Sequence, residues 1–329
     1  MKNKQLTVSY LLAPSRPDSV GSPSGIEHRY HPEKQLLSHH NSDRIDKEII
    51  LSGILKCKRV DLYKEPGKIV TPFQRRRFRN LLQKYKQGCP VAYLTGHKEF
   101  MSLDFIITKD VLIPRPETEL LVEETLKCLP DMATGQAGIG HKTKITILDI
   151  GTGSGNIAIS IVKHCSFLSD WSSSQTGKKL QILSSDISKR ALKIASINAM
   201  RHKVQKQIRF CYGDLFKAFN NLSLARKVDI IVSNPPYITD NDFYKLPISV
   251  RKYEPRVALF SGPDGLFLIR KIISQSPYYL KPQGYLLLEL GQGQSKKVLN
   301  LVKSTNNFED IKILPDYNKI PRVLCAKRI

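Results

Sequence analysis

The hydrophobic pattern of the second half of the chain switches repeatedly between two spacings. Short runs rich in Val, Ile and Leu alternate with longer segments whose apolar residues recur every three or four positions. The predicted strands are 145–150, 180–184, 208–212, 228–232 and 285–289, and the predicted helices are 155–165, 188–201, 264–280 and 294–304. Because strands that alternate with crossover helices form parallel sheets, the pattern predicts an α/β domain with a doubly wound, Rossmann-like sheet.

The first half of the chain begins with two regions of different character. Residues 1–42 are rich in Ser, Pro and His and lack clear periodicity, so we expect a disordered extension. Residues 43–89 carry apolar residues at helical spacing and are predicted to form a small helical domain. Within it, Thr71-Pro72 followed by Gln74 has the pattern of a helix start, and Gly88 that of a helix end.

A linker is expected between the helical domain and the sheet. Residues 90–117 contain two short apolar runs, 105–107 and 111–113, which predict a β-hairpin. A helical pattern resumes over 118–129, and we therefore expect the large second domain to comprise residues 118–329.

The chain is strongly basic, with 52 Lys and Arg against 29 Asp and Glu and a net charge of +23. Such a charge favours acidic partners, including nucleic acid, although a general basic bias explains it equally well. Arg75 to Arg79 is the densest basic cluster, and it is either a contact surface or an ordinary solvated face. No apolar run is long enough to cross a bilayer.

The six cysteines are widely spaced and form no Cys-x-x-Cys pair, so neither a metal site nor a disulfide framework is predicted. They favour a reducing compartment. The first 17 residues contain Lys2, Lys4 and Arg16 and no acidic residue, which allows an organelle import signal. We expect a bacterial-type cytoplasmic protein, with the mitochondrial matrix as the alternative.

A glycine-rich turn follows the first predicted strand. It contains Gly151, Thr152, Gly153, Ser154 and Gly155, immediately before a predicted helix. Glycines at such a turn let the backbone approach a ligand, and the helix start supplies free N–H groups. The sixth position is Asn rather than Gly, so the pattern fits a dinucleotide poorly.

Acidic residues follow the next two predicted strands. Asp186 is placed to accept the hydroxyl groups of a ribose, and Asp214 to accept the amino group of an adenine that Leu215 would cover. This order of glycine turn and two acids is the arrangement that binds S-adenosylmethionine. The alternative is that each acid only caps a helix.

The tetrapeptide Asn234-Pro235-Pro236-Tyr237 ends a predicted buried strand. Ligands of open α/β sheets bind at such strand ends. The two prolines remove two backbone donors and stiffen the loop, which leaves a rim rich in hydrogen-bond acceptors. A rim of this kind suits a planar NH2 group, although Asn-Pro is also common in simple turns.

Together these stretches resemble the release-factor glutamine methyltransferases of the HemK/PrmC type over about residues 43–329. The resemblance rests also on two further stretches, Leu112-Ile113-Pro114-Arg115-Pro116-Glu117-Thr118-Glu119 and Tyr253-Glu254-Pro255. It implies a class I S-adenosylmethionine-dependent methyltransferase fold over 118–329, with a small N-terminal helical domain, 43–89, that recognises the substrate. Departures from the family pattern are the N-terminal extension, the loops 133–143 and 166–179, and Leu215 at a position where an aromatic residue is common.

The resemblance also implies a reaction, in which the side-chain amide nitrogen (N5) of a glutamine is methylated. The side-chain oxygen of Asn234 and the carbonyl of Pro235 would accept the two amide protons, and Tyr237 would pack on the amide plane. Arg115 and Glu117 would join the cofactor-binding residues, and Pro236 the substrate-binding residues. The implied partner is the Gly-Gly-Gln loop of a class I peptide-chain release factor, a substrate in translation termination, and the enzyme would act as a monomer that needs neither metal nor direct nucleic-acid binding.

Two other interpretations share part of this evidence. An amino methyltransferase acting on N6 of adenine or on guanine in DNA or rRNA would use the same Asn-Pro-Pro-Tyr tetrapeptide and suit the charge of +23. It would need a basic, aromatic-lined cleft for a flipped base. A catalytically silent module that only binds a ribosomal partner would not need both an intact glycine turn and an intact tetrapeptide.

Overall fold

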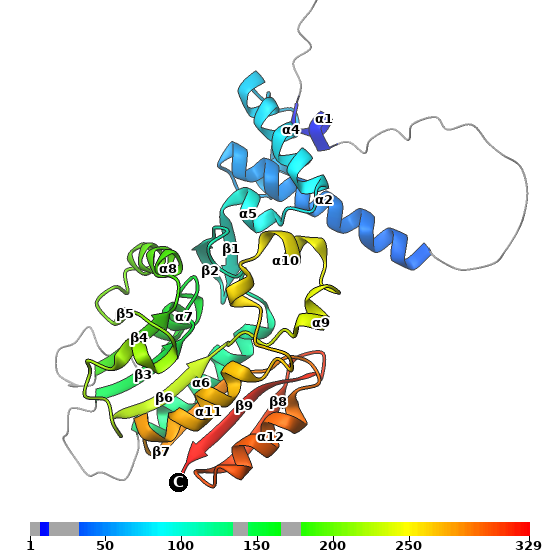
Figure 1. Ribbon diagram of the computed structural model, residues 1–329. Helices are drawn as coiled ribbons and strands as arrows, with labels where there is room; N and C mark the ends of the chain where they lie inside the picture. Colours follow the sequence, from blue (N-terminus) through cyan, green and yellow to red (C-terminus); the bar gives the residue numbers. More distant parts are fainter. Residues whose placement is uncertain (1–6, 13–32, 134–143, 166–178) are drawn as a thin grey trace, which may run out of the picture. The chain divides into compact units, whose positions relative to one another are not determined.

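The computed structural model describes residues 7–12, 33–133, 144–165 and 179–329 (Figure 1). Two compact units make up the chain, residues 1–95 and residues 96–329. Among the described residues, no helix is both long enough and apolar enough to span a bilayer. The predicted loops 133–143 and 166–179 lie almost wholly outside the described residues.

The first unit is helical. It contains α1 (Val8–Leu12), α2 (Glu33–Leu55), α3 (Asp61–Lys64), α4 (Pro72–Lys86) and α5 (Val91–Thr95). Its core is built from residues of several of these helices and of the segment before α4, namely Val8, Ile50, Leu51, Ile54, Leu62, Val70 and Phe78. Val91 and Leu94 of α5 pack against the same core, so this unit extends beyond the predicted boundary at residue 89.

The expected disorder of residues 1–42 is wrong in two stretches. Residues 8–12 form α1, in which Val8 is almost fully buried, and Thr7 pairs with Ile69 in an isolated bridge. Residues 33–42 belong to α2. The apolar residues of Val8–Leu12 explain the first correction, because they give a short helix a face that the core can bury. The remaining residues of the predicted extension are outside the described part of the chain.

The predicted start and end of α4 are confirmed. The Thr71 side chain accepts the backbone N–H of Gln74, and the Gln74 side chain accepts the N–H of Thr71, which completes a capping box. At the other end Gly88 has a φ of +87°, a conformation that a helix cannot continue and that glycine adopts without strain.

The second unit opens with a hairpin that is placed differently from the prediction. Its strands are β1 (His97–Phe100) and β2 (Leu103–Ile106), whereas Val111 to Ile113 form no strand. The two residues between the strands, Met101 and Ser102, both have positive φ, as a tight two-residue hairpin turn requires. The apolar pattern missed this turn because neither residue is the Asn, Asp or Gly that usually marks a two-residue hairpin turn.

A seven-stranded sheet forms the centre of the second unit (Figure 1). The strand order is β5-β4-β3-β6-β7-β9-β8. Five strands are parallel and match the predicted ones, namely β3 (Lys144–Ile150), β4 (Lys179–Asp186), β5 (Ile208–Tyr212), β6 (Val228–Ser233) and β7 (Leu280–Glu289). Two antiparallel strands that the sequence analysis did not predict, β8 (Phe308–Pro315) and β9 (Pro321–Arg328), complete the sheet.

Helices cover both faces of this sheet (Figure 1). The long helices are α6 (Glu117–Ala133), α7 (Asn156–His164), α8 (Lys189–Arg201), α11 (Phe267–Tyr279) and α12 (Ser295–Ser304), and the short ones are η2 (Leu215–Phe219), α9 (Asp240–Phe243), α10 (Ile248–Tyr253) and η3 (Arg256–Ala258). The predicted α/β architecture is therefore confirmed. One core joins Leu148 and Ile231 of the sheet with Ile269 of α11 and Val298 of α12.

The chain order creates a switch point at β3. Strand β4 lies on one side of β3 and β6 on the other, so the connections that follow β3 and β6 run in opposite directions across the sheet. Such a point leaves a crevice at the carboxyl ends of the strands, where ligands of this architecture bind.

Candidate active site

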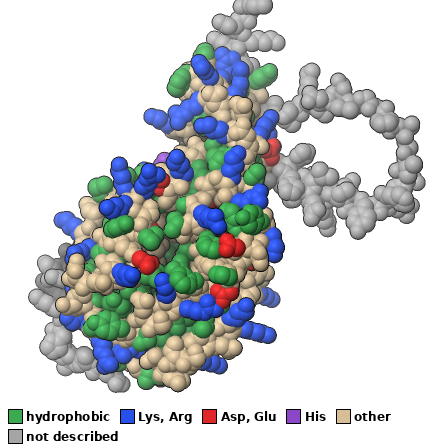
Figure 2. Space-filling model, in the orientation of Figure 1, with side chains coloured by type: hydrophobic (Ala, Val, Ile, Leu, Met, Phe, Trp, Pro, Cys, Tyr) green, Lys and Arg blue, Asp and Glu red, His purple; other side chains and the backbone are tan. Residues whose placement is uncertain are grey.

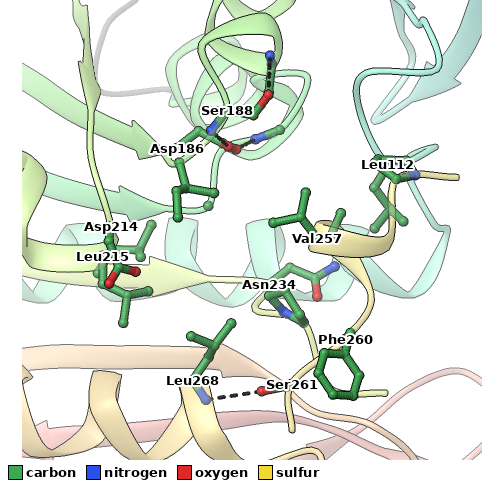
Figure 3. Close-up of a pocket in the computed structure, with 18 of the residues that line it drawn as sticks. Leu112, Asp186, Ser188, Asp214, Leu215, Asn234, Val257, Phe260, Ser261 and Leu268 are labelled. Carbon is green, nitrogen blue, oxygen red and sulfur yellow. Dashed lines mark hydrogen bonds between the residues drawn. The ribbon is translucent and has the colours of Figure 1, made fainter. Parts of the chain in front are cut away.

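A cavity of about 730 Å³ lies at the carboxyl ends of β3, β4, β5 and β6. This volume is typical of small-molecule sites, which span about 300–1,000 Å³. Seven of the predicted site residues line it: Gly151, Gly153, Asp186, Asp214, Leu215, Asn234 and Pro236. Figure 3 shows Asn234 between the two acids on one side and Val257 and Phe260 on the other.

The glycine turn presents bare backbone to this cavity. Gly151 and Gly153 have φ of +76° and +56°, and a Cβ added at either would meet no atom within 4 Å. Thr152, Ser154 and Gly155 do not line the cavity. Thr152 donates its hydroxyl to Asp149 behind the turn, and burial raises the pKa of Asp149 to about 7. These three residues thus shape the turn, while the two glycines face the ligand space.

Asn198 of α8 holds the same turn from outside. Its side chain donates to the carbonyl of Ser154 at 2.9 Å, accepts the N–H of Ile106 at 2.8 Å and donates to the Ile106 carbonyl at 3.0 Å. It is fully buried. Sequence reasoning missed it, because nothing in a helix pattern marks one Asn as the link between a hairpin and a glycine turn.

Asp186 ends β4 and accepts two backbone N–H groups, from Gly153 at 2.9 Å and from Ser188 at 2.8 Å. Burial raises the pKa of this carboxyl group, and the backbone hydrogen bonds oppose the increase. The N-cap of α8 is Ser188, whose hydroxyl accepts from Ala191 (Figure 3). Asp186 therefore does more than cap a helix: it fixes the glycine turn at the edge of the cavity.

Asp214 follows β5 and immediately precedes η2, yet its side chain makes no capping hydrogen bond. Its carboxylate accepts no hydrogen bond from any residue that the structure describes, and it lines the cavity. Leu215 has a φ of +48°, which is unusual for a residue with a Cβ, and it also lines the cavity. A free carboxylate beside an apolar side chain matches the predicted site for an amino-bearing ring.

Asn234 follows β6 and is half-buried. Its side-chain Nδ2 donates to Oγ1 of Thr118, the second residue of α6, at 3.1 Å. Its Oδ1 accepts no hydrogen bond from the described residues, so this oxygen is available to a ligand. Pro236 lines the cavity, whereas Pro235 is buried outside it.

Tyr237 lies outside the cavity lining and packs against the main core. Burial raises the pKa of its hydroxyl to about 12, so the phenol stays neutral at ordinary pH. The side chain of Gln294 donates to the Tyr237 carbonyl at 3.2 Å. The packing fixes the course of the chain immediately after the two prolines.

Glu289, at the end of β7, was missed by sequence reasoning. It is almost fully buried, and burial raises its pKa to about 7. Hydrogen bonding from Thr118, the charge of Arg322 and hydrogen bonding from Asn234 favour its ionised form. An acidic residue at the end of the apolar run Tyr285–Leu288 is the signal that could have revealed it.

Arg115 pairs with Glu254, the residue that follows α10, with Nη2 and Oε1 2.6 Å apart. Neither Arg115 nor Glu117 lines the cavity, so their assignment to the cofactor stays a prediction without a supporting contact. The pair instead anchors the stretch that supplies the apolar wall. This wall was also missed from the sequence. It includes Leu112, Val257, Phe260 and Leu268 (Figure 3), and also Phe267.

Within the described residues, no group of three His, Cys, Asp or Glu side chains could hold a metal ion. The site therefore combines backbone donors, two carboxylates, one amide oxygen and an apolar wall. Such a set can bind a nucleoside-like ligand and present hydrogen-bond acceptors to a second, NH2-bearing molecule beside it.

Two family models match the chain. The model described as a methyltransferase domain covers residues 141–322, and the model described as a PrmC N-terminal domain covers residues 33–96. Among curated proteins, the release factor glutamine methyltransferase of Rhodopirellula baltica is 35% identical over 87% of this chain and 90% of its own length. That of Coxiella burnetii is 36% identical over 90% of this chain and 95% of its own length.

Solved structures with a similar fold are more distant in sequence. The catalytic domain of human Mettl16, solved with an RNA hairpin of the MAT2A 3′UTR, is 15% identical with a TM-score of 0.47, over 79% of this chain and 84% of that one. A ribosomal protein L11 methylase from Lactobacillus delbrueckii is 18% identical with a TM-score of 0.42, over 68% of this chain and 83% of that one.

Proposed function

Because the chain belongs to the release factor glutamine methyltransferases, we propose that it methylates the side-chain amide nitrogen of a glutamine in a class I peptide-chain release factor. The methylated glutamine would be that of the Gly-Gly-Gln motif. The observation that supports this reaction most directly is the orientation of the Asn234 side chain. Asn234 lines the cavity with its Nδ2 engaged by Thr118, which leaves Oδ1 as an acceptor for a substrate amide.

The methyl donor in this proposal is S-adenosylmethionine, and the cavity residues fit it. Gly151 and Gly153 leave open space at their Cα atoms, and Asp214 has a free carboxylate for the adenine amino group. Asp186 is placed at the same edge for the ribose hydroxyls, and Leu215 for the ring face. When bound, the donor supplies an electrophilic methyl group on a sulfonium.

The residues of the tetrapeptide would prepare the substrate. An amide nitrogen is a weak nucleophile because its lone pair is delocalised into the carbonyl group. Oδ1 of Asn234 and the carbonyl of Pro235 would accept its two protons, orient the nitrogen and stabilise the positive charge that develops on it. Tyr237 would fix the loop that carries both acceptors. No group with a catalytic pKa is required, since the nitrogen loses its proton after methylation.

The protein partner would be recognised partly by charge. Helix α4 carries four Arg and two Lys and no acidic residue, and Figure 2 shows Lys and Arg side chains over it. Five of these side chains are exposed and form no ion pair with a described residue, namely Arg76, Arg77, Arg79, Lys84 and Lys86. We therefore assign this face to contact with an acidic surface of the release factor.

The proposed setting is a monomeric enzyme in a bacterial-type cytoplasm, with the mitochondrial matrix as the alternative. The six cysteines are widely spaced in the sequence and form no Cys-x-x-Cys pair, which suits a reducing compartment. The relatives named above are bacterial.

A direct assay tests the function. The purified chain is incubated with labelled S-adenosylmethionine and, separately, with a class I release factor, rRNA and DNA. We expect label only in the release factor, on the Gly-Gly-Gln peptide, as identified by mass spectrometry. Label in rRNA or DNA but not in the release factor would overturn the proposal in favour of a base methyltransferase.

A further inference from the structure

Glu289 is a buried acid beside the proposed catalytic amide. Strand β7 pairs with β6 in parallel register, with Leu288 opposite Ser233, so the next residues along the two segments, Glu289 and Asn234, are neighbours. The side chain of Glu289 is 1% exposed. Its Oε2 atom is buried and has no hydrogen-bond partner among the described residues. A buried carboxyl group is costly, so its retention at this place calls for a reason.

Thr118 connects this acid to the site. It is 1% exposed in the first turn of α6, and its Oγ1 accepts Nδ2 of Asn234 at 3.1 Å. Glu289 faces both side chains, because hydrogen bonding from Thr118 and from Asn234 favours the ionised form of its carboxyl group and so lowers its pKa against the effect of burial. A hydroxyl has one proton, so when it donates to a carboxylate its oxygen can only accept from the other neighbour.

This arrangement gives the chain of hydrogen bonds a direction. The two ends of a carboxamide are nearly equal in size, so Asn234 could present either Oδ1 or Nδ2 to a ligand. An ionised carboxylate only accepts, the Thr118 hydroxyl then donates to it, and Nδ2 of Asn234 must face Thr118. Only that orientation leaves Oδ1 free for the protons of a substrate amide.

We propose that Glu289 and Thr118 are positioning residues that hold the Asn234 carboxamide with its oxygen toward the substrate. The inference rests on the proposed function, and it deepens that function by assigning residues that act through Asn234 rather than on the substrate. Glu289 orients the hydroxyl proton of Thr118 toward itself, and the Thr118 oxygen then orients Nδ2 of Asn234.

A dependence on pH follows from the same geometry. Glu289 is faced by Thr118 and Glu117 of α6, Asn234 and Tyr237 after β6, and Arg322 of β9. Once Glu289 is protonated it can donate to Thr118, and the hydroxyl is then free to donate to Oδ1 of Asn234. The wrong amide orientation becomes available, so methylation should decline as the pH falls through about 7, the pKa to which burial raises this group.

The test compares Glu289→Gln, Thr118→Val and Thr118→Ser with the unmodified enzyme. Thr118→Val keeps the shape of the side chain but removes the hydroxyl, whereas Thr118→Ser restores it. The matched control is Thr125→Val, because Thr125 lies on the same helix, is equally buried and bonds only to the Leu121 carbonyl. The readouts are kcat and KM with the release-factor substrate, the Kd of S-adenosylmethionine by calorimetry, the thermal midpoint, and kcat between about pH 5.5 and pH 8.5.

We expect Glu289→Gln and Thr118→Val to lower kcat roughly 10-fold to 100-fold, as misplacement of one catalytic group does. The Kd of S-adenosylmethionine should stay within about twofold, because both changes act on the acceptor and not on the cofactor. Thr118→Ser should have most of the kcat of the unmodified enzyme. In Glu289→Gln, kcat should no longer decline as the pH is lowered.

The proposal would be overturned if Glu289→Gln and Thr118→Val both kept the kcat of the unmodified enzyme and Glu289→Gln also kept its decline of kcat at low pH. A loss of kcat that only follows the thermal midpoint, and that Thr125→Val reproduces, would overturn it too, because the two residues would then serve stability alone. If Thr118→Val does not fold, the pH profiles of the unmodified enzyme and Glu289→Gln decide. Absence of glutamine methylation by the unmodified enzyme would refute the proposed function instead.

Discussion

Arg115 donates to Glu254 across 139 residues of sequence, with a distance of 2.6 Å between Nη2 and Oε1. The pair joins the segment just before α6 to the residue just after α10. The first segment brings Thr118 to Asn234, and the second leads into the apolar wall of the cavity through Pro255 and Val257. One ion pair thus ties the acceptor side of the site to its cofactor side.

Removal of Arg115 should destabilise the enzyme. The Glu254 side chain is 1% exposed, so Arg115→Ala leaves a buried carboxylate without its cation. We expect a loss of about 3 kcal/mol in the free energy of unfolding, near the low end for a broken buried pair because Arg115 is itself 30% exposed. Urea unfolding measures it. The control Arg256→Ala breaks an exposed pair with Asp240 and should cost less than about 1 kcal/mol. Equal losses in the two variants would contradict the argument.

Replacement of Asp186 should weaken cofactor binding. Asp186→Ala removes the carboxylate that holds the N–H groups of Gly153 and Ser188 and is assigned to the ribose. Hydrogen bonds to a charged group contribute about 1.5–3 kcal/mol each, so the Kd of S-adenosylmethionine should rise roughly 10-fold to 100-fold. Calorimetry measures the Kd, with Glu309→Ala on the edge strand β8 as the control. A Kd that stays the same in both variants would remove Asp186 from the site.

Glu289→Gln should stabilise the protein at high pH and not at low pH. Burial raises the pKa of Glu289 from 4.5 to about 7, so between these values the folded state holds a proton that the unfolded state releases. Stability of the unmodified protein therefore falls as the pH rises through this window. The neutral Gln avoids that loss and should add about 2–3 kcal/mol to the free energy of unfolding at pH 8, but little at pH 4.5. Urea unfolding at the two pH values measures it, and an equal effect at both would show that ionisation of Glu289 is not involved.

Charge reversal on α4 should affect the whole release factor but not a short peptide. The double variant Arg76→Glu with Arg77→Glu removes two exposed cations from a helix that has no acidic residue. We expect KM for the full factor to rise several-fold at low salt, with a smaller effect at high salt because screening weakens the attraction. KM for a Gly-Gly-Gln peptide should not change. Lys297→Glu on α12 is the control, and an unchanged KM for the full factor would exclude α4 from recognition.

Local sequence patterns predicted much of the fold and most of the cavity. The central strands β3 and β6 are nearly continuous apolar runs, because helices bury both of their faces, and such runs are easily recognised. Gly151, Asp186, Asp214 and Asn234 were found because each lies at or just after the carboxyl end of one of the parallel strands, and parallel strands bring those ends to one edge.

The features that were missed depend on contacts between distant parts of the chain. Strand β8 is at the edge of the sheet and mixes charged with apolar residues, and the apolar run of its neighbour β9 is short and flanked by basic residues, so both give a weak signal. Asn198 bonds to Ile106, which is 92 positions away in the sequence. Thr118 bonds to Asn234, which is 116 positions away. Glu289 acquires its raised pKa only from this environment. No local pattern contains such information.

The most direct test of the account concerns Asn234 itself. The rate of methylation of the release-factor glutamine is measured for the unmodified enzyme and for Asn234→Ala, together with the Kd of S-adenosylmethionine. We predict that kcat falls roughly 100-fold or more, as on removal of one group that stabilises a transition state, while the cofactor still binds. Methylation by Asn234→Ala at the rate of the unmodified enzyme would contradict the claim that this side chain presents the acceptor for the substrate amide.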